Sequence, residues 1–321
     1  MKTRLFASLL LTLGFAAASF AQPAPPAYPN KPIRFVVAFA AGSATDAAAR
    51  YVGQQITQMT GQPVIVDNKP GASGFIAVDA VVKAAADGYT VFLTTQTTQA
   101  ANPSLFKRLP YDPVRDLTPV APISRAPLLL IAAPKFAADN LAQLTALAKA
   151  RPGKLTFGAG NSSARAGGEL FKMLAGVDLL HVPYKSNPQA ITDLIGGQID
   201  LVWADVFTGM TQVRAGNAKA LATTGKRRIE AAKDVPTMIE QGLPGYELYA
   251  WTGVYLPAKA PPAIVQRLNQ LVAAAVQADP KFFAVTGAEQ FTASPQEFAR
   301  FQDAEIALWA RIVKTAGIEP E

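Results

Sequence analysis

Cysteine is absent from the 321-residue chain, and histidine occurs only once, as His181. The chain therefore forms no disulfide and has no thiol for a lipid anchor or a thiolate metal site. A zinc site at His181 would lack both a second histidine and a cysteine as partners. His181 lies in the apolar segment DLLHVPY (178–184), which favours a structural role. We expect no metal and no cofactor.

Signatures of nucleotide and nucleic-acid binding are missing as well. The turn AFAAGSATD (38–46) leads from a strand-like segment into a helix, but it holds one glycine, Gly42, and no Gly-Lys-Ser/Thr. The formal charge is +7, and only Lys226-Arg227-Arg228 forms a basic run, as is typical of a solvated turn. The free N–H groups of a helix start suit a smaller anion. We predict a small anionic ligand and no nucleic-acid partner.

A long apolar run occurs at the beginning of the chain. Lys2 and Arg4 precede the apolar residues 5–20, and SFA (19–21) has small residues at the two positions that signal peptidase reads. The run is too short and too rich in alanine to favour a membrane span. We predict a signal peptide over 1–21, cleavage after Ala21, and export to the periplasm of a Gram-negative cell.

Strand and helix patterns alternate along the remaining chain. The patterns predict strands at 32–39, 63–68, 89–95, 154–160, 178–184, 199–205 and 218–224. They predict helices at 43–60, 71–86, 140–150, 162–175 and 187–195, one that ends near 214, and two at 261–278 and 294–316. This order predicts mostly parallel sheets with both faces covered. Two apolar segments, 126–134 and 247–258, break the order and are expected to run as strands between two lobes.

Four turns follow predicted strands where ligands collect in doubly wound sheets, beyond the carboxyl ends. They are AFAAGSATD (38–46), TTQTTQAAN (94–102), GAGNSSAR (158–165) and WADVFTG (203–209). All four are rich in Ser, Thr, Gly and backbone donors and poor in metal ligands. This composition is typical of a binding cleft rather than of a reactive centre.

Several longer blocks are similar to one family. They include YPNKPIRFVVAFAAGSATDAAAR (28–50), GQPVIVDNKPGASGF (61–75), NPSLFKRLPYDPVRDLTPVAPI (102–123), GELFKMLAGVDLLHVPYK (168–185) and LPAKAPPAIVQRLN (256–269). These blocks follow one another in the family's order from Tyr28 nearly to the end of the chain. The chain therefore resembles the solute receptors of tripartite tricarboxylate transporters, also called Bug receptors. The resemblance implies an α/β, two-lobed, type II periplasmic binding protein. Each lobe would have a mostly parallel sheet flanked by helices, and two strands would form the hinge.

The same resemblance implies how the chain is divided and what it does. Lobe 1 is expected to contain 22–126 and 249–321, and lobe 2 is expected to contain 127–248. The protein would act as a monomeric receptor that closes on a small carboxylate and delivers it to a membrane permease. A dicarboxylate or an aromatic carboxylate is favoured. The chain also departs from the family pattern, which usually places Pro and a second Gly in the first turn, His where Arg165 stands, and H-V-P-Y-K-G-G where this chain has HVPYKSN (181–187).

The first turn offers the clearest ligand candidates, and two interpretations are open for them. Ser43 and Asp46 have the spacing of a capping box, and Asp46 can pair with Arg50. Alternatively, the backbone N–H groups and Ser43 hold a ligand carboxylate directly or through water. The candidate residues of this turn are Phe39, Ala41, Gly42, Ser43, Ala44, Thr45 and Asp46.

The other turns supply further candidates. Thr95, Gln96, Thr97 and Thr98 present neutral donors, and at least one of them is expected to face the ligand. Arg165 is expected to bind a second carboxylate in a bidentate pair, to form an interlobe salt bridge, or to be simply exposed. Ser162 and Ser163 cap the same helix or contact the ligand. Lys185 is a further candidate for ligand binding. Asp205 is expected to hold a ligand ammonium or hydroxyl, to cap the next helix or to pair with Arg165. Trp203 and Phe207 are core or wall residues.

Two other classes of protein compete with a receptor. GNSSA (160–164) faintly resembles a nucleophile elbow, but the second glycine is missing and His181 precedes Asp205, the reverse of the hydrolase order. A carboxylate sensor domain, as in LysR-type regulators, shares the two-lobed architecture. The predicted signal peptide and the absence of a helix-turn-helix pattern argue against it. We therefore predict a binding protein and not an enzyme.

Overall fold

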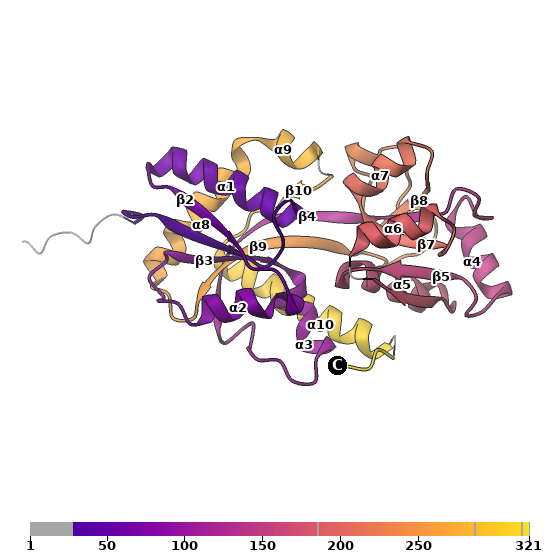
Figure 1. The fold of residues 1–321 in the computed structure, drawn as a ribbon, viewed down its shortest axis with the longest axis horizontal. Coiled ribbons are helices and arrows are strands. Elements are labelled where there is room, and N and C mark those ends of the chain that lie inside the picture. Colours follow the sequence, from indigo (N-terminus) through magenta and orange to yellow (C-terminus); the bar gives the residue numbers. More distant parts are fainter. Residues whose placement is uncertain (1–27, 185, 286, 316, 321) are drawn as a thin grey trace, which may run out of the picture.

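The computed structural model describes residues 28–320 except 185, 286 and 316. The predicted signal peptide and its cleavage site lie outside this part of the chain. Within the described residues, no helix is long and apolar enough to cross a membrane. The elements form two lobes joined by two long strands (Figure 1).

Lobe 1 begins with a parallel βαβαβ unit in which β1 lies between β2 and β3. The unit consists of β1 (Ile33–Val37), α1 (Ala44–Thr60), β2 (Val64–Asn68), α2 (Phe75–Val82) and β3 (Thr90–Thr95). Helix α1 begins after Ser43 and ends at Gly61, which has a left-handed φ of 70°. Helix α2 is shorter than predicted because it ends at Lys83 and follows a short 3₁₀ turn, η1 (Ala72–Gly74).

Lobe 2 repeats this plan with a second parallel set, in which β5 lies between β6 and β7. Its elements are α4 (Leu141–Ala150), β5 (Thr156–Ala159), α5 (Ser162–Ala175), β6 (Leu180–Pro183), α6 (Asn187–Ile195), β7 (Leu201–Asp205), α7 (Val206–Arg214), β8 (Lys219–Thr223) and the 3₁₀ turn η3 (Glu230–Ala232). The predicted positions of these helices and strands are confirmed to within a few residues.

Strands β4 (Leu117–Ala132) and β9 (Tyr249–Pro257) connect the lobes and pair antiparallel over most of their length. Strand β4 pairs with β9 and β10 (Glu289–Gln290) at first, and farther along with β7 and β8. It begins nine residues before the segment predicted at 126–134. The predicted lobe limits at 126/127 and 248/249 stay a prediction, although both fall where these two strands pass between the lobes.

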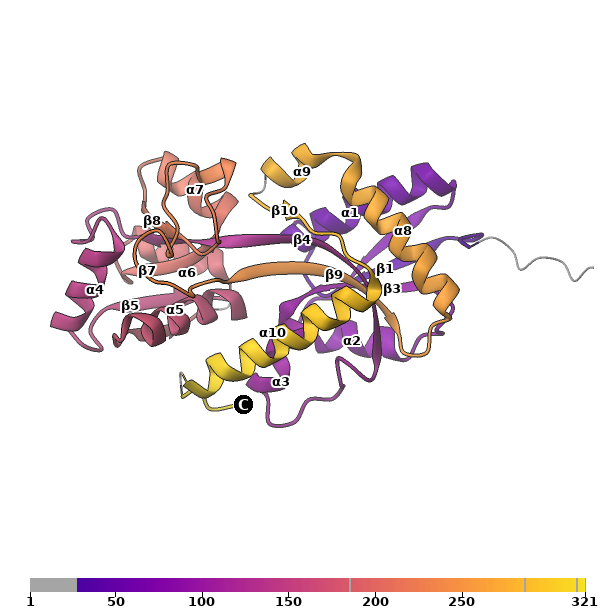
Figure 2. The same cartoon turned by 180° about the vertical axis from the view of Figure 1, so that it is seen from behind.

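The chain ends on lobe 1 with α8 (Pro262–Ala278), α9 (Pro280–Val285) and α10 (Pro295–Thr315). Helix α8 packs beside α1, and α10 packs against α3 (Asn102–Leu105) and the π-helix η2 (Thr97–Ala101). Figure 2 shows that α10 extends from lobe 1 towards lobe 2, where it meets α5.

The hydrophobic core is shared on one face of the sheet and divided on the other. One cluster runs continuously from Phe92 in β3 through Trp251 in β9 to Trp203 in β7. The opposite face holds two separate clusters, one under α1 and α8 and one under α6 and α7. The two lobes thus share a hydrophobic core along one side only.

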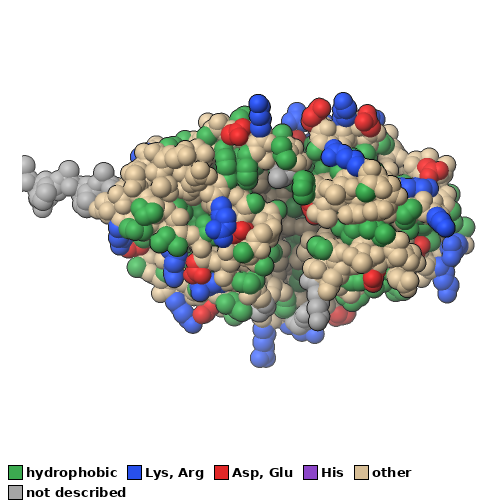
Figure 3. Space-filling view, turned by 45° about the horizontal axis from the view of Figure 1, so that its top comes forward, with side chains coloured by type: hydrophobic (Ala, Val, Ile, Leu, Met, Phe, Trp, Pro, Cys, Tyr) green, Lys and Arg blue, Asp and Glu red, His purple; other side chains and the backbone are tan. Residues whose placement is uncertain are grey.

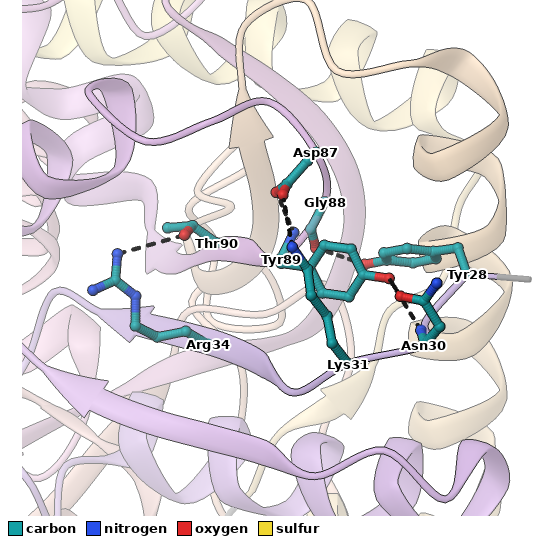
Figure 4. Close-up of polar contacts among 8 residues, drawn as sticks. All are labelled: Tyr28, Asn30, Lys31, Arg34, Asp87, Gly88, Tyr89 and Thr90. Atoms are coloured by element: carbon teal, nitrogen blue, oxygen red, sulfur yellow. Dashed lines mark hydrogen bonds and ion pairs between the residues drawn. The ribbon is translucent and has the colours of Figure 1, made fainter. Parts of the chain in front are cut away.

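The first described residues anchor the chain to the turn before β3 (Figure 4). The Tyr28 hydroxyl donates to the Gly88 carbonyl oxygen at 2.6 Å, and the Tyr89 hydroxyl donates to Asn30 Oδ1 at 2.6 Å. The Lys31 Nζ lies 3.2 Å from an Asp87 carboxylate oxygen and 4.2 Å from the centre of the Tyr89 ring. These contacts fix the start of β1 on the outer end of lobe 1, away from lobe 2.

Candidate functional site

The turn between β1 and α1 is shaped by one buried carboxylate. Ser43 caps α1, because its hydroxyl oxygen accepts from the Asp46 N–H at 3.2 Å. Asp46 accepts in return from the N–H of Gly42 at 2.9 Å, one residue earlier than in a regular capping box. Gly42 has a φ of 82°, which favours glycine at this position. The predicted capping interaction therefore forms in a shifted version.

Asp46 is only 3% exposed. Its two oxygens also accept from Arg50 Nε at 3.0 Å and from Asn68 Nδ2 at 3.0 Å. Burial opposes ionisation, but the hydrogen bonds from Arg50, Gly42 and Asn68 outweigh it and lower the pKa of Asp46 below its usual value. Asp46 therefore braces the turn, with both of its oxygens bonded to protein donors.

Asn68, at the end of β2, was not among the predicted site residues. Its Nδ2 bridges Asp46 and the backbone oxygen of Phe39 at 3.0 Å, which ties the end of β2 to the turn after β1. The signal in the sequence is its position, since it ends the strand segment PVIVDN next to the first turn.

The turn leaves specific backbone donors for a ligand. The N–H of Gly42 is taken by Asp46, and the N–H of Ser43 donates to Ala40 O at 3.2 Å. Within the described chain, the N–H groups of Ala44 and Thr45 have no acceptor in hydrogen-bond range. Both belong to the first turn of a 17-residue helix, where the helix dipole favours an anion.

The second turn, after β3, is held by its own side chains. The hydroxyl oxygen of Thr95 accepts from the N–H of Thr97 at 3.3 Å, and both threonines are half-buried. Gln96 is 4% exposed, and both ends of its amide are occupied by protein groups, Ser163 and the N–H of Trp251. Thr98 is completely buried and its hydroxyl lies 2.8 Å from that of Thr94.

The third turn begins α5, and its cap differs from the prediction. Asn161 is the N-cap, with Oδ1 accepting from the Ala164 N–H at 2.9 Å, so neither Ser162 nor Ser163 caps the helix. An asparagine in extended conformation directly before the helix competes successfully with the serines for this position. The Ser162 side chain is half-buried and Ser163 is 5% exposed.

Asn187 supports this third turn in the same way that Asn68 supports the first. Its Oδ1 accepts from Gly160 N at 2.8 Å and its Nδ2 donates to Trp203 O at 3.3 Å. A Cβ at Gly160 would lie 2.0 Å from the Ser186 backbone carbon, so the two chain segments are in close contact. Asn187 thus joins the ends of β5 and β7 to the start of α6.

Arg165 is half-buried and lies in the first turn of α5. Its Nε is buried and, within the described residues, has no hydrogen-bond partner. Neither of its predicted pairings, with Asp205 or across the lobes, is found among the described ion pairs. The guanidinium therefore retains donors for an anion.

The fourth turn, between β7 and α7, is capped by Asp205. Its Oδ1 accepts from the Thr208 N–H at 2.8 Å and from the Thr208 hydroxyl at 2.7 Å, while the residue is exposed. Of the three roles considered for Asp205, the structure shows helix capping. Trp203 is completely buried against Phe157 and Phe171, so it belongs to the core. Phe207 is 57% exposed.

A hydrolytic triad is not assembled in the described chain. His181 lies against the Phe157 ring, and its Nε2 has no hydrogen-bond partner among the described residues. Burial, together with the positive charges of Arg165 and Lys172, lowers the pKa of His181 to about 4. The Asp205 carboxylate accepts hydrogen bonds from Thr208 instead. Lys185, the remaining predicted site residue, lies outside the described residues.

Figure 3 shows a furrow between the two lobes. At one side of the molecule, a cavity of about 430 Å³ lies between α7 of lobe 2 and α9 of lobe 1. It is lined by apolar side chains, including Phe207 and Val285, together with Arg214 and Lys281. Close to it, a Cβ at Gly287 would lie 2.8 Å from Val206 Cβ, so the turn after α9 contacts the start of α7.

Comparison with known proteins places this arrangement in a family. Residues 48–318 match the model of the tripartite tricarboxylate transporter family receptors. Protein BugT from Bordetella pertussis is 36% identical over 323 residues, covering 98% of each chain. The chain therefore belongs to the tripartite tricarboxylate transporter receptor family, whose members are periplasmic solute-binding receptors.

Solved structures show the same fold. The Rpa4515 protein of R. palustris, solved with adipate, has a TM-score of 0.83 and 35% identity, with 92% of this chain and 100% of that chain covered. MatC from Rhodopseudomonas palustris, solved with bound malate, has a TM-score of 0.77 and 30% identity, with 89% and 100% covered. The predicted two-lobed α/β fold of periplasmic binding proteins is confirmed.

Proposed function

We propose that this protein binds a small dicarboxylate between its lobes and delivers it to a tripartite tricarboxylate-type permease. In this proposal it acts as an exported monomer, cleaved after Ala21, and it is not an enzyme. The observation that carries the ligand class is a pair of donor sets on opposite lobes. Among the described residues, the N–H groups of Ala44 and Thr45 at the start of α1 have no acceptor, and the buried Nε of Arg165 in the first turn of α5 has no hydrogen-bond partner.

Each donor set suits one carboxylate. Backbone N–H groups at a helix start bind an anion without an opposing cation, and they also bind through water. A planar guanidinium binds a carboxylate with two parallel hydrogen bonds. Two relatives of the same fold were solved with dicarboxylates, adipate and malate, and this supports the assignment. An aromatic carboxylate is the second candidate, because the exposed ring of Phe207 lies at the edge of the interlobe region.

Adipate and hexanoate provide the sharpest test, because they share a six-carbon chain and differ in one carboxylate. We expect Arg165→Ala to weaken adipate binding by about 2–5 kcal/mol if the pair is buried, and to affect hexanoate far less. Isothermal titration of both ligands measures the two losses. Arg151→Ala, which removes an exposed arginine of the same lobe, is the matched control and should change neither affinity.

A panel of other carboxylates extends the test if adipate does not bind. A ligand at 100 times its dissociation constant raises the free energy of unfolding by about 2.7 kcal/mol, which a thermal-shift screen detects. Equal losses for the matched mono- and dicarboxylate in Arg165→Ala would contradict the two-point arrangement. The absence of any stabilising carboxylate would contradict the ligand class.

A further inference from the structure

We propose that Gln96 is an interlobe latch, a positioning residue that holds the ligand-binding end of α5 against the hinge strand β9. It is a different role from the direct ligand contact considered for this residue above. The ligand arm of this proposal rests on the proposed function, whereas the latch itself can be tested without any ligand.

Gln96 lies where the ladder between β3 and β9 stops. The last pairs of this ladder are Thr94 with Gly253 and Thr95 with Thr252. At Gln96 the backbone turns into a helical conformation, with φ −51° and ψ −23°, and leads into the π-helix η2. The side chain then replaces the missing backbone partner, because Oε1 accepts from the Trp251 N–H at 3.0 Å.

The other end of the amide reaches across to lobe 2. Its Nε2 donates to the hydroxyl oxygen of Ser163, the second residue of α5. The orientation of the amide is set by chemistry, since a backbone N–H only donates and must therefore face the amide oxygen. Gln96 thus uses its acceptor on the hinge and its donor on lobe 2, and it is 4% exposed.

The two partners differ in how firmly they are held. Trp251 is anchored in lobe 1, since its indole Nε1 donates to Glu305 of α10 at 2.9 Å and its ring packs edge-on against Phe298 and Phe301. Ser163 belongs to lobe 2 and lies in the first turn of α5, two residues before Arg165. When the lobes separate, the bond between Gln96 and Ser163 breaks and the bond to Trp251 remains.

Two engineered labels can follow this separation, because the chain contains no cysteine of its own. Gln58→Cys in α1 and Gln189→Cys in α6 place one exposed thiol on each lobe. Spin labels on this pair report the interlobe distance distribution in the full protein without added ligand. A buried neutral hydrogen bond shifts such an equilibrium by about fivefold.

We expect Gln96→Leu to lower the ratio of closed to open molecules by about fivefold and thereby shift the distribution to longer distances. Ser163→Ala removes only the lobe 2 partner and should shift it in the same direction. The double variant should show little additional effect, because both changes break the same bond. Gln99→Leu is the matched control. Gln99 lies in η2 and is buried like Gln96, but its partners, Thr98 and Gln302, belong to lobe 1.

A folded Gln96→Leu variant with the wild-type distance distribution would overturn the latch. If that variant does not fold, Ser163→Ala decides alone, and an unchanged distribution there has the same meaning. A titration with adipate, followed by the carboxylate panel, separates the two proposals. An altered distance distribution in the variants, with no carboxylate of the panel stabilising any of them, would leave the latch standing and contradict the proposed ligand class.

Discussion

At the scale of single residues, the binding turns are built on buried polar groups that serve the backbone. Asp46 and Asn68 brace the turn after β1, and Asn187 braces the turn after β5. These side chains present few atoms to a ligand, but they decide where the backbone N–H groups point. In the proposed function, ligand specificity then depends on groups that lack partners among the described residues, above all the buried Nε of Arg165.

Asp46 should therefore control both stability and its dependence on pH. We expect Asp46→Ala to lower the free energy of unfolding at pH 7 by about 2–3 kcal/mol, because three donors lose a charged acceptor. The pKa of Asp46 is depressed in the folded protein, so its contribution is present above the unfolded pKa of about 3.9 and disappears as the pH falls through the folded value.

Urea unfolding of wild type and Asp46→Ala at pH 7 and at acidic pH measures this difference. The gap between the two proteins should narrow as the solution becomes more acidic. The control is Asp79→Ala, since Asp79 also pairs with a basic residue four positions away but both side chains are exposed. We expect that variant to lose less than about 0.5 kcal/mol. A gap that is the same at both pH values would show that the charge of Asp46 contributes nothing.

The site was predictable from the sequence only in part, because the fold decides which distant groups become hydrogen-bond partners. The turn at 38–46 and its cap follow from local spacing, since Ser43 and Asp46 are three residues apart. Gln96 could be identified as a polar residue after a strand, but its partners Ser163 and Trp251 are 67 and 155 residues away. The prediction that Ser162 and Ser163 cap α5 is wrong because Asn161, directly before them, is the N-cap.

At the scale of elements, the parallel units and the two connecting strands were predictable, except for the first nine residues of β4. Each βαβ unit carries its apolar period and its caps within about 30 residues of sequence. Strand β4 contains Pro119, Pro122 and Pro127, which normally exclude a central strand. Two of them, Pro119 and Pro122, stand directly before register shifts against β9, so the regular ladder is interrupted beside each of them. Such irregular pairing is decided by long-range contacts and leaves no local signal.

The anchor of the first strand provides a test at this scale. Gly88 has a φ of 85°, and a Cβ there would lie 2.4 Å from Ile264 Cγ2 and 2.8 Å from Tyr28 Cε2. Figure 4 shows Tyr28 beside Gly88, to which its hydroxyl is hydrogen-bonded. We expect Gly88→Ala to lower the free energy of unfolding by about 2–5 kcal/mol, from backbone conformation and overpacking together. Gly216→Ala is the control for the effect of backbone conformation without overpacking.

Gly216 has a similar φ of 75°, but a Cβ there would meet no atom within 4 Å. We expect this control to lose only about 1–2 kcal/mol. Denaturant unfolding of the two variants gives the contribution of the packing as the difference. Equal losses would mean that Tyr28 and Ile264 move aside, and that the contact between the first residues and the turn before β3 is adaptable.

At the scale of the whole molecule, the arrangement of the cores restricts how the lobes can move. The cluster that contains Trp251 and Trp203 is continuous across the connection, whereas the clusters under α1 and under α6 and α7 are separate. A second group of contacts near the hinge links the lobes electrostatically. Glu289 accepts from Arg125 at 3.2 Å and lies 3.6 Å from Arg227 of lobe 2. We therefore expect the lobes to separate by opening the furrow, with the shared core as the pivot.

This pivot predicts how the overall dimensions respond to a ligand. A ligand that contacts both lobes shifts the population towards the closed form, by no more than its difference in affinity for the two forms. We expect the radius of gyration from small-angle X-ray scattering to decrease when a saturating carboxylate is added. The decrease should be larger in Gln96→Leu than in wild type, because more of the variant is open before the ligand binds. Gln99→Leu should behave as wild type. If saturating ligand leaves the radius unchanged in both wild type and Gln96→Leu, the protein binds without closing, and the hinged mechanism is wrong even where the binding site is right.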